Sequence, residues 1–205
     1  MELDELKSAW AQYDKKLTAN LKFNEELLRK TNLDRSKREM TTPLNYELFS
    51  VFSGIIALLF IVISTFRFGE NTILLISGIL SALIFTLYLF FSIHRLMLMS
   101  EIDFYNSSIV ELQKKLARVK QKYLLYKKLE MLSFPLFAIV ISPIGAKSLR
   151  NFDILSHPYS FIIAFVLSLS LGYPLMLWVY KNWYEKKIKN TNTFLEELNK
   201  FEKEE

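Results

Sequence analysis

The chain has 205 residues, of which 51% are hydrophobic and 23% are charged, and the two kinds alternate in long blocks. This distribution excludes an ordinary soluble domain and predicts an all-α membrane protein with charged helical appendages. The net charge of +5 is explained by basic residues that flank spans and lie against anionic headgroups, without nucleic acid as a partner. Cysteine is absent, which removes disulfides, thiolate catalysis and Cys-ligated metal sites.

The first segment, residues 1–45, is charged from its second residue and has no apolar stretch, so no cleavable signal peptide is predicted. Apolar residues recur there at heptad spacing, which predicts a cytoplasmic amphipathic helix. Its stripe is our candidate surface for binding a partner, and it consists of Leu3, Leu6, Trp10, Tyr13 and Leu17.

Residues 46–100 contain two apolar blocks that are each long enough to cross a bilayer as a helix. The first runs from Tyr46 to Phe68, with no charge between Glu47 and Arg67, and the second runs from Thr72 to Ser100, with no charge before Arg95. A short RFGEN turn joins them, so we expect a transmembrane hairpin.

Residues 101–128 are predicted to form a cytoplasmic helix, because apolar residues alternate at steps of three and four. Charged and amide residues fill the other faces, so this helix needs a partner along one stripe. The predicted coiled-coil seam consists of Ile102, Tyr105, Ile109, Leu112, Leu116, Val119, Tyr123 and Tyr126.

Residues 129–180 are predicted to form a second transmembrane hairpin. Its first span, from about Met131 to Ala146, is short and carries Pro135 and Pro143, so a kinked helix and a re-entrant helix both remain open. The fourth span, Tyr159 to Tyr180, closes with aromatic residues of the kind that anchor a helix at a membrane interface.

The tail, residues 181–205, is predicted to form a cytoplasmic helix whose apolar positions are Ile188, Phe194 or Leu195, Leu198 and Phe201. The three amphipathic segments can bury their stripes against one another, against a second copy of the chain, or against a cytosolic protein.

Orientation follows from the distribution of Lys and Arg, which are retained in cytoplasmic loops near the spans. Nine precede the first span, eight lie from Arg95 to Lys128 and six follow Tyr180, whereas the two short connections hold three of the 26. The pattern predicts a multi-pass membrane protein with both termini in the cytoplasm.

The search for chemistry predicts no enzyme and no catalytic, cofactor-binding or metal site. The cores of the predicted spans lack Asp, Glu, Lys and Arg, which disfavours a charge-coupled transporter. His94 and His157 have no further ligands at suitable spacing, and phosphate-binding, nucleophile-elbow and zinc-protease motifs are missing.

The first segment contains the pattern LxxLKxxWxxxDxKL, formed by Leu3, Leu6, Lys7, Trp10, Asp14, Lys16 and Leu17. In this pattern, and over most of its length, the chain resembles a group of short, largely uncharacterised inner-membrane proteins of Bacteroidota. Members of such groups are often encoded beside sigma factors of the extracytoplasmic-function type. The resemblance implies a membrane-tethered, anti-sigma-like regulator of the bacterial inner membrane with a sigma factor as its partner, and it supplies no catalytic residue.

Two functions from different classes remain open at this stage. One is a non-enzymatic membrane scaffold or regulator that binds a partner, or a second copy of itself, through cytosolic helices. The other is an oligomeric channel or transporter for ions or small solutes, which could use the proline-containing third span.

Overall fold

The computed structural model describes residues 2–201, with the side chains of residues 2–6, 9 and 201 outside the description. Within this part of the chain every regular element is helical, which confirms the predicted all-α class. The elements are α1 (Glu2–Arg67), α2 (Thr72–Ser100), α3 (Ile109–Arg150), a 3-10 turn η1 (Ile154–Ser156), α4 (Pro158–Val179), a π-helical turn η2 (Tyr180–Glu185) and α5 (Lys186–Phe201).

Four helices are long and apolar enough to cross a membrane. They lie within α1, within α2, within α3, and within the continuous run from α4 through η2 to α5. The chain is therefore a multi-pass membrane protein by the length and composition of its helices.

The connections begin and end at residues whose side chains stop or start a helix. Asn71 caps α2 by accepting hydrogen bonds from the backbone N–H groups of Ile73 and Leu74. Asn151 ends α3 in the left-handed conformation, with φ of 50° and its N–H donating to the Lys147 carbonyl. These caps fix where the chain turns between candidate spans.

The third candidate span is one uninterrupted helix of 42 residues despite its two prolines. Pro143 lacks the N–H that would bond the Ile139 carbonyl, and the Ser142 hydroxyl donates to that carbonyl at 2.9 Å instead. The structure therefore has helix throughout this segment, and a full crossing of the bilayer by it stays a prediction.

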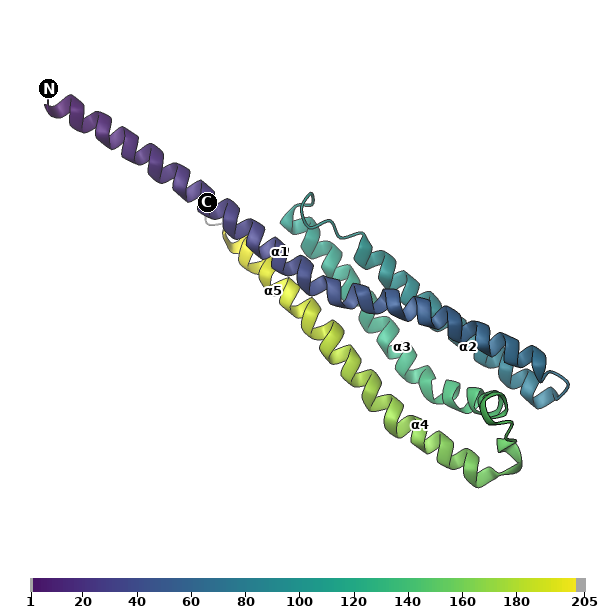
Figure 1. Ribbon diagram of the computed structural model, residues 1–205. Helices are drawn as coiled ribbons and strands as arrows, with labels where there is room; N and C mark the ends of the chain where they lie inside the picture. The colour runs from purple at the N-terminus through teal and green to yellow at the C-terminus, as the bar shows by residue number, and fades with distance from the viewer. Residues whose placement is uncertain (1, 202–205) are drawn as a thin grey trace.

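Helices that follow one another in the sequence pack together, and α5 returns to lie beside α1 (Figure 1). Helix α1 lies along α2 and α5, α2 lies along α3, and α3 contacts α4 and α5. Glycines permit close approach: a Cβ on Gly78 of α2 would lie 2.1 Å from Oγ1 of Thr65 on α1. Helix α4 itself has no buried residue, so it is the least enclosed of the candidate spans.

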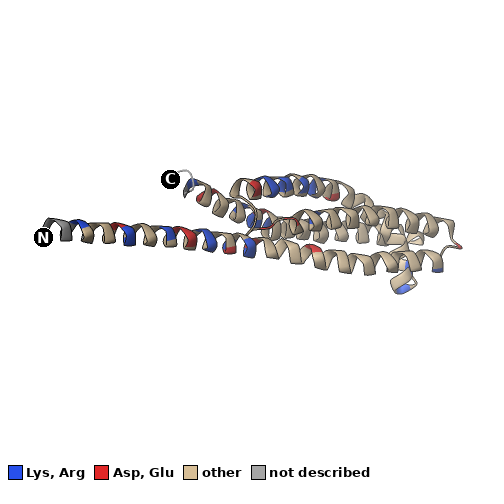
Figure 2. Ribbon diagram, turned by 90° about the horizontal axis from the view of Figure 1, so that it is seen from above, with Lys and Arg blue, Asp and Glu red and all other residues tan. Residues whose placement is uncertain are grey.

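Charged residues gather toward the end of the molecule that holds both termini (Figure 2). At that end α3 buries one stripe against α1 and α5, forming a core outside the apolar spans. The core includes Leu33 and Met40 of α1, Ile109, Leu112, Leu116, Val119 and Tyr123 of α3, and Ile188, Leu195 and Leu198 of α5. The stripe predicted for α3 thus has its partners within the same chain, and Leu195 rather than Phe194 supplies the buried position in the tail.

The predicted start of the central helix is wrong. Ile102 and Tyr105 lie in an irregular connection, residues 101–108, and α3 begins at Ile109. The Asp103 carboxylate accepts hydrogen bonds from the backbone of Tyr105 and Asn106 and from the Asn106 side chain, which forms a tight turn. Those bonds, the Asn106 side chain first, lower the pKa of Asp103. Ser108 then caps the new helix at the N–H of Glu111.

Tyr126, the last residue of the predicted seam, is buried against a different neighbour. Its ring stacks on Phe91 of α2 at 4.6 Å between centroids, and its hydroxyl lies 3.1 Å from Nδ1 of His94. The stripe on α3 therefore changes partner along its length, from α5 near its start to α2 at Tyr126.

Candidate functional site

Three charged side chains from three helices meet in the interior of the bundle. Arg95 of α2 donates through Nε to Oε1 of Glu47 on α1 and through Nη1 to Oε1 of Glu130 on α3, the latter at 2.7 Å. The side chains are 6%, 0% and 9% exposed, respectively. We name Glu47, Arg95 and Glu130 the ionic cluster.

Hydroxyl groups complete the hydrogen bonding of both carboxylates. The Ser92 hydroxyl donates to Oε2 of Glu47, and the Tyr184 hydroxyl donates to Oε1 of the same residue. Tyr180 donates to Oε2 of Glu130. Each carboxylate oxygen of the cluster therefore accepts a hydrogen bond, which a buried charge requires if it is to remain ionised.

The two tyrosines are placed by the π-helical turn η2. A π-turn inserts an extra residue into a helix and leaves backbone groups without regular partners, and such turns are frequent at functional sites. The Tyr123 hydroxyl donates to the carbonyl of Tyr180 at 3.2 Å, and its ring stacks on Tyr184 with 5.0 Å between the ring centroids. The irregular turn η2 therefore carries two of the hydroxyl groups that bond the carboxyl groups of the ionic cluster.

The cluster holds two carboxyl groups and one guanidinium in a place from which water is largely excluded. It carries one excess negative charge when all three groups are ionised, and it is neutral when one carboxyl group holds a proton. A separate ion pair, Lys127 with Glu185 at 2.6 Å, is partly exposed and neutral as a pair. Charged groups at such depth in a membrane bundle are costly to insert and commonly serve function.

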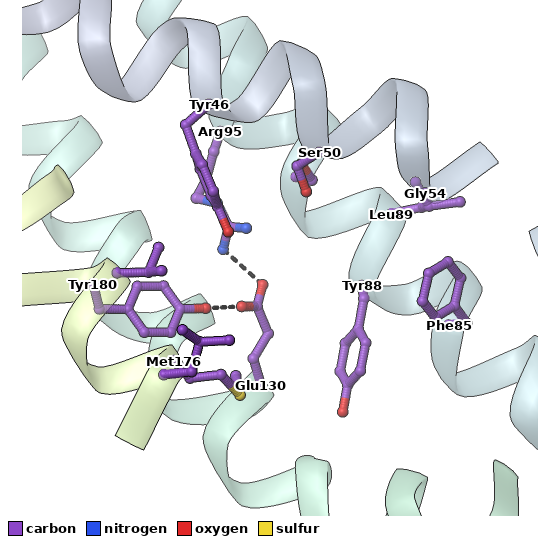
Figure 3. Close-up of a pocket in the computed structure, with 13 residues that line it drawn as sticks. Tyr46, Ser50, Gly54, Phe85, Tyr88, Leu89, Arg95, Glu130, Met176 and Tyr180 are labelled. Carbon is purple, nitrogen blue, oxygen red and sulfur yellow. Dashed lines mark hydrogen bonds and ion pairs between the residues drawn. The ribbon is translucent and has the colours of Figure 1, made fainter. Parts of the chain in front are cut away.

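A cavity of about 270 Å³ adjoins the cluster (Figure 3). Its wall comes from α1, α2, α3, α4 and η2, so four candidate spans contribute to it. Arg95, Glu130 and Tyr180 form one end of the wall, and Gly54, Phe85 and Leu89 lie toward the other.

The stripe predicted for partner binding lies far along α1 from this site. Trp10 and Tyr13 are 69% and 66% exposed, and Leu17 is exposed as well. The side chains of Leu3 and Leu6 lie outside the described residues. Every described side chain from Lys7 to Thr31 is exposed, because this part of α1 extends beyond the other helices (Figure 1).

Sequence reasoning missed the ionic cluster. It placed Arg95 among the basic residues that flank spans, but Arg95 is buried between two carboxylates, and it treated Glu47 as the limit of a span. The sequence does contain a usable signal. Glu47, Arg95 and Glu130 are single charges at the ends of three apolar blocks, and all three ends are predicted to lie on the same side of the membrane. At the end of the fourth block on that side, Tyr180 and Tyr184 are four residues apart.

Within residues 2–201, no group of three or more His, Cys, Asp and Glu side chains is arranged to hold a metal ion. His94 contacts Tyr126, and Nδ1 of His157 lies 3.2 Å from the carbonyl of Asp153 in the connection before α4. Neither histidine adjoins the ionic cluster through a hydrogen bond in that part of the chain.

Comparisons with protein-family models, with curated proteins and with solved structures find no match to this chain, so its function has to be argued from the geometry above.

Proposed function

We propose that the protein is a non-enzymatic membrane-anchored scaffold or regulator that binds a cytosolic protein through the first half of α1. The observation that best supports this proposal is that α1 projects beyond the bundle, with Trp10, Tyr13 and Leu17 exposed. Large aromatics on an exposed helix are the residues that most often dominate a helix-in-groove contact.

In the proposed topology the four spans form two hairpins in the bacterial inner membrane, with both termini and the core around Leu112 in the cytoplasm. The excess of Lys and Arg on that side supports it. The segments α3 and α5 already bury their stripes within the chain, so the projecting part of α1 is what remains for a partner.

The resemblance to Bacteroidota membrane proteins encoded near sigma factors supports a sigma factor as the partner, which would make the protein anti-sigma-like. The two short connections on the opposite side, between α1 and α2 and between α3 and α4, offer little surface for sensing. A signal would then reach the protein through lipid, through another membrane protein or from the cytosol.

The test is capture of the partner from the native host in mild detergent, identified by mass spectrometry. We expect Trp10→Ala with Tyr13→Ala to abolish capture while membrane insertion is unchanged, because both side chains are solvent-exposed in the free protein. The matched control, Gln12→Ala with Lys15→Ala, changes two exposed residues at the same spacing and is expected to retain capture. Equal capture by both double variants would remove the stripe from the proposal.

The ionic cluster beside a cavity favours a second candidate, an oligomeric channel or transporter for ions or small solutes. Flux through liposomes that contain the purified protein tests it. Specific flux that is lost in Glu130→Gln supports this candidate, and silence across ions and neutral solutes counts against it.

A further inference from the structure

The cavity beside the ionic cluster is graded in polarity along the bundle axis. On three of the contributing segments, polar residues lie toward the end that holds the termini and apolar residues lie deeper in the span. Tyr46 and Ser50 precede Gly54 on α1, Arg95 and Ser92 lie outside Leu89 and Phe85 on α2, and Tyr180 of η2 lies outside Met176 and Leu175 of α4. Tyr88 is the deeper polar residue of the lining, and its hydroxyl lies 2.9 Å from the hydroxyl of Ser133. Apart from Tyr88, this is the order of polarity that a lipid presents from head to tail.

The polar end retains unused hydrogen-bond donors. Arg95 employs Nε and Nη1 on the two carboxylates, and among the described residues no hydrogen bond is formed by its Nη2. The hydroxyls of Tyr46 and Ser50, which line the same end, also make no side-chain hydrogen bond within that part of the chain. The site therefore offers donors to a ligand that can accept.

The charge of the site selects the kind of acceptor. Because Glu47 and Glu130 already offset the charge of Arg95, a carboxylate or phosphate head finds no net positive charge to bind at this site. A neutral carbonyl or hydroxyl oxygen can accept from Nη2 of Arg95 without adding charge.

Size and openness limit how much of a ligand is enclosed. A volume of about 270 Å³ lies just below the range of roughly 300–1,000 Å³ for sites that enclose a drug-sized molecule. Leu175 lines the cavity and is 62% exposed, so a chain can leave past α4 into the surrounding lipid. Helix α4 has no buried residue, which is consistent with a wall that lipid completes.

We infer that this cavity binds an uncharged acylglycerol lipid, with its ester carbonyl and glycerol hydroxyls at Arg95, Tyr46 and Ser50 and its acyl chain between Phe85, Leu89 and Met176. This assignment does not depend on the proposed partner of α1. It makes the protein a receptor for a neutral membrane lipid.

The test is binding of a monoacylglycerol to the purified full-length protein in detergent, measured by native mass spectrometry. Binding of the fatty-acid anion of the same chain length is measured in the same way for comparison. We expect one monoacylglycerol per chain and at least tenfold weaker binding of the anion. Equal or stronger binding of the anion would overturn the assignment of a neutral head.

Two serines of α1 provide matched variants. Ser50→Leu places an apolar side chain in the cavity and is expected to weaken monoacylglycerol binding at least tenfold, whereas Ser53→Leu, one turn along and outside the cavity lining, is expected to leave it unchanged. Unchanged binding by Ser50→Leu would contradict the site.

A second measurement uses the wild-type protein and therefore does not depend on whether Ser50→Leu folds. A monoacylglycerol that carries a diazirine in its tail is photolysed on the wild-type protein, and the labelled residues are mapped. Labels concentrated at Leu175, Met176 and Phe85 support the site. Labels spread evenly over exposed α4 positions such as Ile162 and Ile163 would show annular lipid and overturn it.

Discussion

At the scale of single residues, Arg95 determines whether two buried carboxylates can coexist. Its guanidinium bonds Glu47 and Glu130 from two other helices, and hydroxyls from Ser92, Tyr180 and Tyr184 supply the remaining donors. Removing one partner from such a set lowers the stability of the fold strongly, because the remaining charges stay buried without a partner.

We therefore predict that Arg95→Met lowers the free energy of unfolding by about 3–5 kcal/mol, measured by denaturant titration in detergent. Arg67→Met is the control, because Arg67 is exposed at the end of α1 and its loss leaves no buried charge unpaired. Equal free energies for the two variants would show that Glu47 and Glu130 are not held as ions by Arg95.

Tyr184→Phe removes one donor to Glu47 and keeps the ring that stacks on Tyr123. We expect a loss of about 1.5–3 kcal/mol in the free energy of unfolding, the usual contribution of a hydrogen bond to a charged group. Tyr159→Phe, at an exposed position at the start of α4, should change the same quantity by less than about 0.5 kcal/mol. A similar loss in both would contradict the role given to the Tyr184 hydroxyl.

The positions of the cluster residues were visible in the sequence, but their pairing was not. Hydropathy places Glu47, Arg95 and Glu130 near the ends of apolar blocks, where charges usually meet water and headgroups. Whether such a charge turns outward or inward depends on the rotation of each helix about its axis, which is set by packing with its neighbours. Hydropathy carries no information about that rotation.

At the scale of elements, the alternation of three and four steps along α3 predicted which side chains are buried. Ile109, Leu112, Leu116, Val119 and Tyr123 are all in the core. The same pattern failed over Ile102 and Tyr105, because periodicity does not register the competing hydrogen bonds of Asp103 or the cap at Ser108. A helix predicted from apolar periodicity should therefore be ended where the sequence offers a capping residue, such as Ser108.

Two valines on α3 test the core directly. Val119 is 2% exposed and Val110 is 67% exposed. We expect Val119→Ala to lower the free energy of unfolding by about 1.5–3 kcal/mol and Val110→Ala to leave it nearly unchanged, since only the first loses buried contacts. If the two changes were equal in detergent, the stripe on α3 would not be buried within a single chain.

The projecting part of α1 lacks the tertiary packing that stabilises most helices in proteins. We predict that backbone amides of residues 10–28 exchange with deuterium about 100-fold faster than those of residues 112–123. Slow exchange at residues 10–28 in the purified protein would indicate that this part of α1 is already covered, for example by a second copy. Protection that appears on addition of the captured partner would locate its contact.

At the scale of the whole molecule, the absence of cysteine permits a clean test of topology. Single substitutions to cysteine at four exposed positions, Asn20, Glu70, Lys120 and Ser156, can be labelled in intact spheroplasts with a maleimide that does not cross the membrane. We expect labelling at Glu70 and Ser156, and labelling at Asn20 and Lys120 after the membrane is opened. Labelling of Lys120 in intact spheroplasts would contradict the orientation deduced from the basic residues.

Helix α1 is unbroken from Glu2 to Arg67, which corresponds to a length of about 99 Å. It leaves the bundle beyond a packed stretch whose buried residues include Leu33 and Met40. The distance from Leu33 to Trp10 is about 35 Å, so a tilt of roughly 10° in the packed stretch would move Trp10 by roughly 6 Å relative to Leu33. Helix α1 is in this respect a lever arm: a small tilt within the bundle becomes a larger displacement at its tip.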